Sequence, residues 1–240
     1  MRSGEWVPAH GVASTVDRAG AVYAYKRTAG GISSPQVLIS PQPEANALFG
    51  IRTAISGDTL LVSENSFKAV HVFNLATGWK STLSIPAPVG TKAFGIDIAI
   101  ENSLVAIGAP GNKAEDSGTF VYELSGSSAT EVAVLKHATL SAMGSAVAIS
   151  NGRVASASGY QCEGCAKIVV YERSGSSWVA GTPFGPGAGL AVPEGLEPLG
   201  FGWSGMNFQG DTLLIGAAFE SYGGTGVNPD RSLVQVPRSR

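Results

Sequence analysis

The 240-residue sequence has few charged residues, only two cysteines and no long apolar run. Charged residues make up 14% of the chain and the formal net charge is −2, whereas a globular domain usually carries about 25% charged residues. The basic residues are scattered, so we expect no basic face for phosphate groups and no nucleic-acid partner. No run of 18 apolar residues occurs, so we expect no membrane span. The N-terminal MRSGEWVPAH lacks the apolar region of a signal peptide, and we expect any secretion leader to lie outside this chain.

The usual sequence signatures of catalysis are also missing. No Gly-x-Ser-x-Gly, His-Glu-x-x-His or phosphate-cradling loop occurs, and GFGWSG at 200–205 lacks the spacing of a nucleophile elbow. Of the three histidines, His10 lies near an end and His137 in a link between repeats. His71 occupies a strand column that other repeats fill with apolar residues, and we interpret it as a core position. We predict no catalytic residue and no enzyme activity.

Glycine, by contrast, is abundant, and its positions reveal an internal repeat. The chain has 32 glycines, and four of them complete the recurring pairs that open each copy: Phe49-Gly50, Phe94-Gly95, Met143-Gly144 and Phe201-Gly202. A small residue closes a second apolar run 13, 13, 13 and 14 positions after these glycines, at Ser63, Gly108, Ala157 and Gly216. Between the two runs lie the polar turns SGDT, ENS, SNG and QGDT, which are typical of hairpins. Each copy is therefore predicted to begin with a two-stranded hairpin.

A third and a fourth strand are predicted after each hairpin. The third runs are AVHVF (69–73), TFVY (119–122) and KIVVY (167–171), and the N-terminal AVYAY (21–25) has the same form without a preceding Phe-Gly pair. Trp79 and Trp178 follow six or seven residues later and precede short extended runs. The small and apolar residues on both faces of these strands indicate sheets packed between neighbouring sheets.

These residues resemble the FG-GAP repeats of integrin alpha-chain β-propellers, and more closely the bacterial FG-GAP-like repeats of the form FGxSVAISGDTLLVGAP…GAVYVF…W. The resemblance covers residues 12 to 228 and is best in 201–217 and 19–25. It implies an all-β fold, a β-propeller of four-stranded antiparallel blades, in an extracellular or cell-surface protein. We expect one domain over 1–240, with repeats at 12–48 (partial), 49–93, 94–142, 143–200 and 201–240 (partial).

Two ways of closing the propeller follow from the partial repeats at the chain ends. In the first, strands 203–208 and 212–217 pair with N-terminal strands 20–26 and 36–39, so that about four blades close a monomeric ring. In the second, residues 233–236 form the last blade's own third strand and the chain is part of a larger propeller.

Integrin-type repeats often bind calcium through an Asp-rich loop between the first two strands, and calcium needs six to eight oxygen ligands. Here each of these turns has at most one carboxylate, from Asp58, Glu101 or Asp211. We therefore predict no metal site and no cofactor, and interpret the turn residues as stabilising their hairpins.

Cys162 and Cys165 form the only Cys-x-x-Cys pair, in GYQCEGCAK. A zinc site needs four ligands, and a thioredoxin-like motif needs a βαβ context. A local disulfide is the favoured interpretation in an extracellular domain, with free thiols and a metal or redox role as alternatives.

We predict a non-catalytic extracellular binding or adhesion module that uses its propeller loops to bind a protein or glycan ligand. Rigid scaffolds commonly present function on loops, and the second-to-third-strand loops and blade linkers are expected to share one rim. The candidate ligand-binding residues are Asn112, Lys113, Glu115, Asp116, Tyr160, Gln161, Glu163, Glu220, Tyr222 and Asn228. The alternatives are a structural spacer or truncated fragment of a larger FG-GAP surface protein, and a hydrolase or lyase with a site in the central channel.

Overall fold

The computed structural model describes residues 16–65, 67–159, 166–186, 189–190, 196–197, 201–217, 221–222 and 234–235. It is an all-β chain in which three sheets have four antiparallel strands each, in consecutive order. The first blade contains β5 (Arg52–Ser56), β6 (Thr59–Ser63), β7 (Ala69–Asn74) and β8 (Lys80–Pro86). The second contains β9 (Ile98–Glu101), β10 (Leu104–Ala109), β11 (Gly118–Ser125) and β12 (Ser128–Leu135). The third contains β13 (Met143–Ser150), β14 (Arg153–Ser158), β15 (Lys167–Ser174) and β16 (Ser177–Ala180).

Partial sheets lie at the two ends of this series. At the N-terminal end, β1 (Val22–Ala24) pairs with β4 (Gln36–Leu38), and β2 (Arg27–Thr28) and β3 (Gly31–Ile32) form a hairpin between them. The fourth blade consists of β20 (Phe201–Gln209), β21 (Thr212–Ala217) and β23 (Val234–Gln235). Two further short pairs join β17 (Gly185–Pro186) to β18 (Gly189–Leu190) and β19 (Leu196–Glu197) to β22 (Ser221–Tyr222). The helical structure described is a single 3₁₀ turn, Leu75–Thr77, and no helix among the described residues could cross a membrane.

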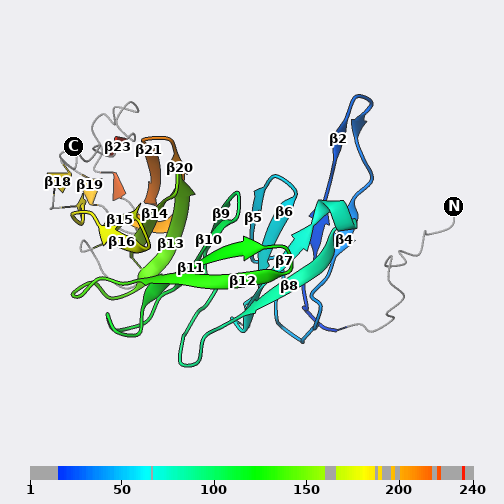
Figure 1. Cartoon of the computed structure of the whole chain (residues 1–240), viewed down its shortest axis with the longest axis horizontal. Helices are drawn as coiled ribbons and strands as arrows, with labels where there is room; N and C mark the ends of the chain where they lie inside the picture. The colour runs from blue at the N-terminus through cyan, green and yellow to red at the C-terminus, as the bar shows by residue number, and fades with distance from the viewer. Residues whose placement is uncertain are drawn as a thin grey trace, which may run out of the picture.

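The blades adopt a propeller arrangement, so the predicted fold is confirmed. The first strands of successive blades, β5, β9, β13 and β20, lie against one another, whereas the outer strands β8, β12 and β16 touch at few positions. Figure 1 shows the sheets side by side in chain order. Every predicted third strand is present, including the N-terminal one, β1.

The Phe-Gly pairs mark the contact of each blade with the one before it. Gly50, Gly95, Gly144 and Gly202 all have positive φ, between 74° and 97°, which glycine adopts without a steric penalty. A Cβ on Gly95 would lie 3.1 Å from the Cβ of Ser63, and a Cβ on Gly202 would lie 3.0 Å from that of Ala157. The small residue that ends the second strand therefore receives the glycine of the next blade, which explains why both are small.

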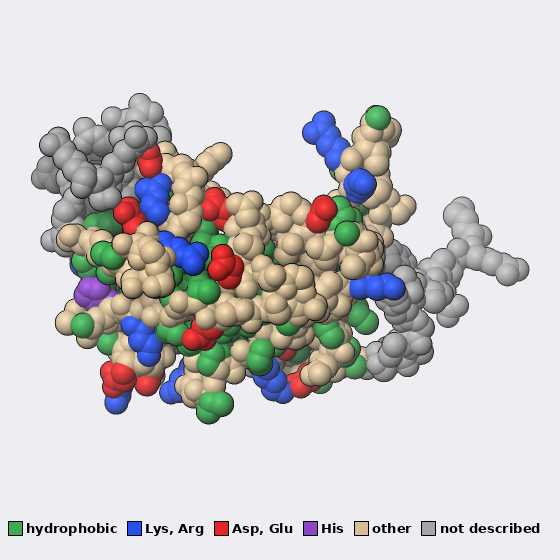
Figure 2. Space-filling view, viewed as in Figure 1, with side chains coloured by type: hydrophobic (Ala, Val, Ile, Leu, Met, Phe, Trp, Pro, Cys, Tyr) green, Lys and Arg blue, Asp and Glu red, His purple; other side chains and the backbone are tan. Residues whose placement is uncertain are grey.

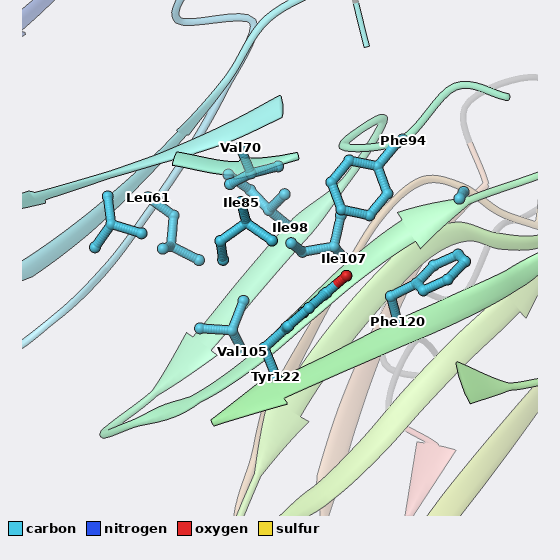
Figure 3. Packing of buried hydrophobic residues seen from close by; sticks show 11 residues of the cluster. Leu61, Val70, Ile85, Phe94, Ile98, Val105, Ile107, Phe120 and Tyr122 are labelled. Carbon is cyan, nitrogen blue, oxygen red and sulfur yellow. The ribbon is translucent and has the colours of Figure 1, made fainter. Parts of the chain in front are cut away.

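Apolar side chains fill the space between neighbouring blades. Between the first two blades, Leu61, Val70 and Ile85 pack against Ile98 and Ile107 (Figure 3). Phe94, the aromatic partner of Gly95, is fully buried and meets Phe120 edge to face with ring centroids 5.7 Å apart. Equivalent clusters lie between the second and third blades, the third and fourth blades, and the N-terminal pair and the first blade. Each of the three complete blades is thus buried on both faces, as the sequence predicted.

Among the described residues, the predicted pairing between residues 203–217 and the N-terminal strands is not found. Instead β21 pairs with β23, and β1 is hydrogen-bonded to β4. Figure 1 shows β4 and β21 at opposite ends of the row of blades. The strand pairing is that of the second closure, in which residues 233–236 supply the last blade's third strand.

Candidate functional site

The loops between second and third strands contact the linkers between blades, so both lie on one rim as predicted. In the first blade, the Lys68 amine pairs with the Glu44 carboxylate of the preceding linker, and Asn65 N donates to Ala47 O over 2.7 Å. In the second blade, Lys136 Nζ donates to the Glu115 carbonyl oxygen over 2.6 Å. The rim is therefore a connected surface of polar loops rather than a set of separate turns.

Loop 110–117 of the second blade brings four predicted binding residues together. Asn112, Lys113, Glu115 and Asp116 are all exposed. The loop is closed tightly, because a Cβ on Gly111 would lie 2.5 Å from the Asp116 carbonyl oxygen. Lys113 Nζ lies 3.8 Å from Glu115 Oε1, an exposed pair that leaves both charges accessible to a ligand. This loop presents opposite charges and an amide on a fixed backbone.

The other predicted site residues cannot be placed in this arrangement. Tyr160, Gln161, Glu163, Glu220 and Asn228 lie outside the described residues, as do Cys162 and Cys165. Tyr222 belongs to β22 and its backbone is paired with Leu196. Those residues remain predictions.

A buried polar cluster lies on the rim between the N-terminal strand pair and the first blade. His71 and Glu64 are 4% and 5% exposed, and His71 Nε2 lies 3.6 Å from Glu64 Oε2. His71 Nδ1 is 2.8 Å from the hydroxyl of Ser84, an exposed residue on β8. Ser40 Oγ donates to Glu64 Oε2 over 3.5 Å, which links the cluster to the preceding linker. Hydroxyl, imidazole and carboxylate thus lie in series, and the hydroxyl is at the surface.

Burial lowers the pKa of His71, and the charge of the neighbouring Glu64 carboxylate partly offsets this effect. His71 is a core position, as predicted, with its ring 5.7 Å from that of Phe49. The sequence analysis missed Glu64. The sequence signal for Glu64 was a carboxylate directly after the small residue that closes the second strand, where the other repeats have Ala109, Ser158 and Ala217. The repeat of the first blade thus has an acidic residue and a histidine at two positions where the other repeats have small or apolar residues.

The inner strands carry a second polar contact. Asp97, just before β9, accepts a hydrogen bond from Val147 N of the third blade over 2.8 Å and lies 3.8 Å from Arg52 Nε of the first blade. Burial raises the pKa of Asp97, while the Val147 N–H and the Arg52 charge act in the opposite direction. One carboxylate thereby connects three successive blades.

The opposite face of the blades carries the hairpin turns, which interlock by a repeated hydrogen bond. The residue ending each first strand accepts from a turn amide of the next blade: Asn102 N to Ser56 Oγ (2.9 Å), Asn151 N to Glu101 Oε1 (2.9 Å) and Gly210 N to Ser150 Oγ (2.8 Å). Asn102 and Asn151 adopt positive φ in their own hairpins, as expected of turn residues. Glu101, however, stabilises the neighbouring blade's hairpin rather than its own.

Arg153 adds an ion pair to this face, since its Nη2 lies 2.9 Å from Asp211 Oδ1. A groove of about 450 Å³ lies beside it between the second and third blades, lined by Glu101, Ser103, Glu123, Arg153 and Arg173. Glu123 and Arg173 form an ion pair of 3.7 Å there. Figure 2 shows acidic and basic side chains interspersed over the visible face. Among the described residues, no group of three or more His, Cys, Asp or Glu side chains could hold a metal ion.

No protein-family model matches the chain, and no curated protein sequence matches it. Among solved structures, it is similar to the crystal structure of AztD from Citrobacter koseri, with a TM-score of 0.43 and 15% identity over 91% of this chain and 55% of AztD. The apo form of the same protein gives 0.43 and 14% over 93% and 61%. PorZ of Porphyromonas gingivalis, described as a bacterial surface component of the type-IX secretion system, gives 0.31 and 16% over 88% and 26%. The chain thus spans less than two thirds of each of these proteins.

Proposed function

We propose that this chain is a non-catalytic binding module of the FG-GAP-like type, at or outside a cell surface, which binds a protein or glycan through its loop rim. The observation that carries the proposal is loop 110–117, where four exposed polar side chains stand on a backbone fixed by close contacts. A rigid loop loses little conformational entropy on binding. The opposite charges of Lys113 and Glu115 suit a polar ligand surface with a complementary pair.

The test is binding of the immobilised 240-residue chain to a printed array of glycans and purified extracellular-matrix proteins. We expect at least one of them to bind, with an affinity that falls as salt is added. The variant Asn112→Ala, Lys113→Ala, Glu115→Ala, Asp116→Ala should lose this binding. A matched control, Asp58→Ala with Lys80→Ala, removes two exposed charges from the turn face and should bind like the wild type. Binding to nothing on the array would contradict the proposal and favour a structural spacer.

The cluster around His71 favours a second candidate function, ester hydrolysis. Ser84 Oγ is 2.8 Å from His71 Nδ1, within the range for a general base to accept the hydroxyl proton as the oxygen attacks a carbonyl. The charge that would develop on the imidazole faces Glu64. A fluorophosphonate probe should then modify the wild type and not Ser84→Ala, while Ser81→Ala on the same strand reacts normally. An unmodified wild type would exclude this candidate.

A further inference from the structure

The N-terminal strand pair is the outer half of a blade. By sequence register, β1 is a third strand, because Tyr25 occupies the column of Phe73, Tyr122 and Tyr171. In each complete blade the third strand pairs on its inner side with the second strand. Among the described residues, β1 is paired only with β4. Its inner edge therefore presents backbone N–H and C=O groups that can pair with another strand.

The side chains on and just after β1 that face away from the first blade are exposed, as expected of a blade that lacks its inner half. Tyr25 is 60% exposed, whereas Phe73, Tyr122 and Tyr171 in its column are 3%, 6% and 3% exposed. Tyr23, two residues earlier, is 55% exposed. Elsewhere in the chain these columns are buried against the preceding blade. Exposed aromatic residues on an open sheet edge mark a surface suited to association.

The fourth blade has the complementary inner half. The second strands of the complete blades make five or six residue pairs with their third strands. Within the described residues, β23 pairs with only Thr212 and Leu213 of β21. The rest of that edge, from Leu214 to Ala217, lies beyond the β23 ladder. Leu214 is 46% exposed, whereas Leu61, the residue in its column of the first blade, is fully buried.

The two halves match in register and in side-chain direction. The pairs Val105↔Tyr122 and Ile107↔Phe120 of the second blade predict Leu213 opposite Tyr25 and Ile215 opposite Tyr23. The two tyrosines would then face the third blade of the chain that supplies β21. Leu214 would point the other way, with Val22 and Ala24, which pack against Leu60 and Phe73. All three exposed side chains become buried in this arrangement.

Within one chain these halves lie at opposite ends of the row of blades (Figure 1). We propose that a second copy of the chain supplies the missing half, with β1 of one copy pairing with β21 of the other and replacing the short β23 ladder. In the described part of each copy there are three complete blades, the outer half formed by β1 and β4, and the inner half formed by β20 and β21. With β1 in place of β23, two copies and two equivalent junctions form a closed ring of eight blades. Eight is within the known range of four to eight, and two head-to-tail junctions related by a two-fold axis close without leaving a free edge.

Light scattering coupled to size exclusion tests the proposal on the purified chain. We expect twice the 24.5 kDa chain mass, about 49 kDa. Tyr23→Glu and Leu214→Glu each place a charge in both junctions and should return the mass to that of one chain. Val89→Glu, a control at a fully exposed linker position, should remain a dimer. A monomeric wild type over a wide concentration range would overturn the proposal.

Mixing the two monomeric variants separates a specific junction from misfolding. The Leu214→Glu chain keeps an intact β1 and the Tyr23→Glu chain keeps an intact β21, so the mixture should form a dimer through one junction. Misfolded variants would not complement each other, and circular dichroism of each alone checks the fold. If Leu214→Glu alone remained a dimer while Tyr23→Glu did not, the two copies would pair through β1 on both sides, and the shared blade would be wrong.

Discussion

Gly108 of the second blade and Gly144 of the third lie backbone against backbone: a Cβ on Gly108 would lie 2.0 Å from the Gly144 carbonyl oxygen. A second residue of the second blade also encloses Gly144, since a Cβ on Gly144 would lie 2.4 Å from the Gly118 carbonyl oxygen. Three glycines from two repeats therefore meet at one point. The amide of Gly144 also donates to Ser156 Oγ of its own blade over 3.1 Å.

Replacing Gly144 by alanine should destabilise the protein strongly. The new Cβ would overlap backbone atoms that cannot move away, and φ is +89°, where an L side chain is strained. We expect a loss of about 3 kcal/mol or more in the free energy of unfolding, measured by urea denaturation. The control Gly126→Ala has φ +59° and open space around the Cβ, so only the strain of about 1 kcal/mol should appear. Equal losses in the two variants would contradict the importance of this contact.

Removing the guanidinium of Arg153 should weaken the contact between the third and fourth blades and lower the free energy of unfolding. This group donates to Gly210 O and to Asp211 Oδ1, and it lies 4.8 Å from the centroid of the Phe208 ring. Arg153→Ala should cost about 2–3 kcal/mol, because the Arg153 side chain is largely buried and its partners lose charged hydrogen bonds. Arg173→Ala breaks an exposed pair with Glu123 and should cost less than about 1 kcal/mol. A loss for Arg153→Ala no larger than this would show that the buried contact adds nothing.

Asp97→Asn should stabilise the protein at neutral pH. Burial raises the pKa of Asp97 in the folded state, so the stability linked to its protonation is present below the unfolded value near 3.8 and is lost as the pH rises through the folded pKa. At pH 7 the charged carboxylate costs about 1.4 kcal/mol for each unit of that rise. The asparagine oxygen can still accept from Val147 N, and we expect a gain of about 1 kcal/mol in thermal or urea unfolding. A less stable variant would mean that the attraction between Asp97 and Arg52 outweighs the cost of burying the charge. The control is Asp58→Asn, a change at an exposed carboxylate.

Acidification should weaken the fold through His71. Burial lowers its folded-state pKa below the usual 6.5. The unfolded chain therefore binds a proton first, so stability is present above pH 6.5 and is lost as the pH falls from there through the folded pKa. The free energy of unfolding, measured by urea denaturation from pH 7 to 5, should fall by up to about 1.4 kcal/mol per pH unit.

The double variant His71→Val, Glu64→Ala places in both columns the residues that other repeats have there, Val169 and Ala109. It should lack this loss, whereas His137→Gln, a change at a half-buried linker position, should retain it. An unchanged slope in the double variant would assign the acid sensitivity to another group.

The sequence alone determined the blades, because each repeat carries its own local signals. Glycine after a large apolar residue, a polar two-residue turn and an aromatic residue ending the third strand recur at fixed spacing, and each acts within a few residues of itself. The position of loop 110–117 was also predictable, since it falls between two predicted strands.

Contacts between repeats were decided only by the tertiary structure. Glu101 looked like a turn residue of its own hairpin, yet its carboxylate accepts from Asn151 and Gly152 of the next blade. The pairing of β21 with β23 depends on how successive blades pack against one another. No single residue encodes that arrangement, because it results from the packing of whole side-chain layers between sheets.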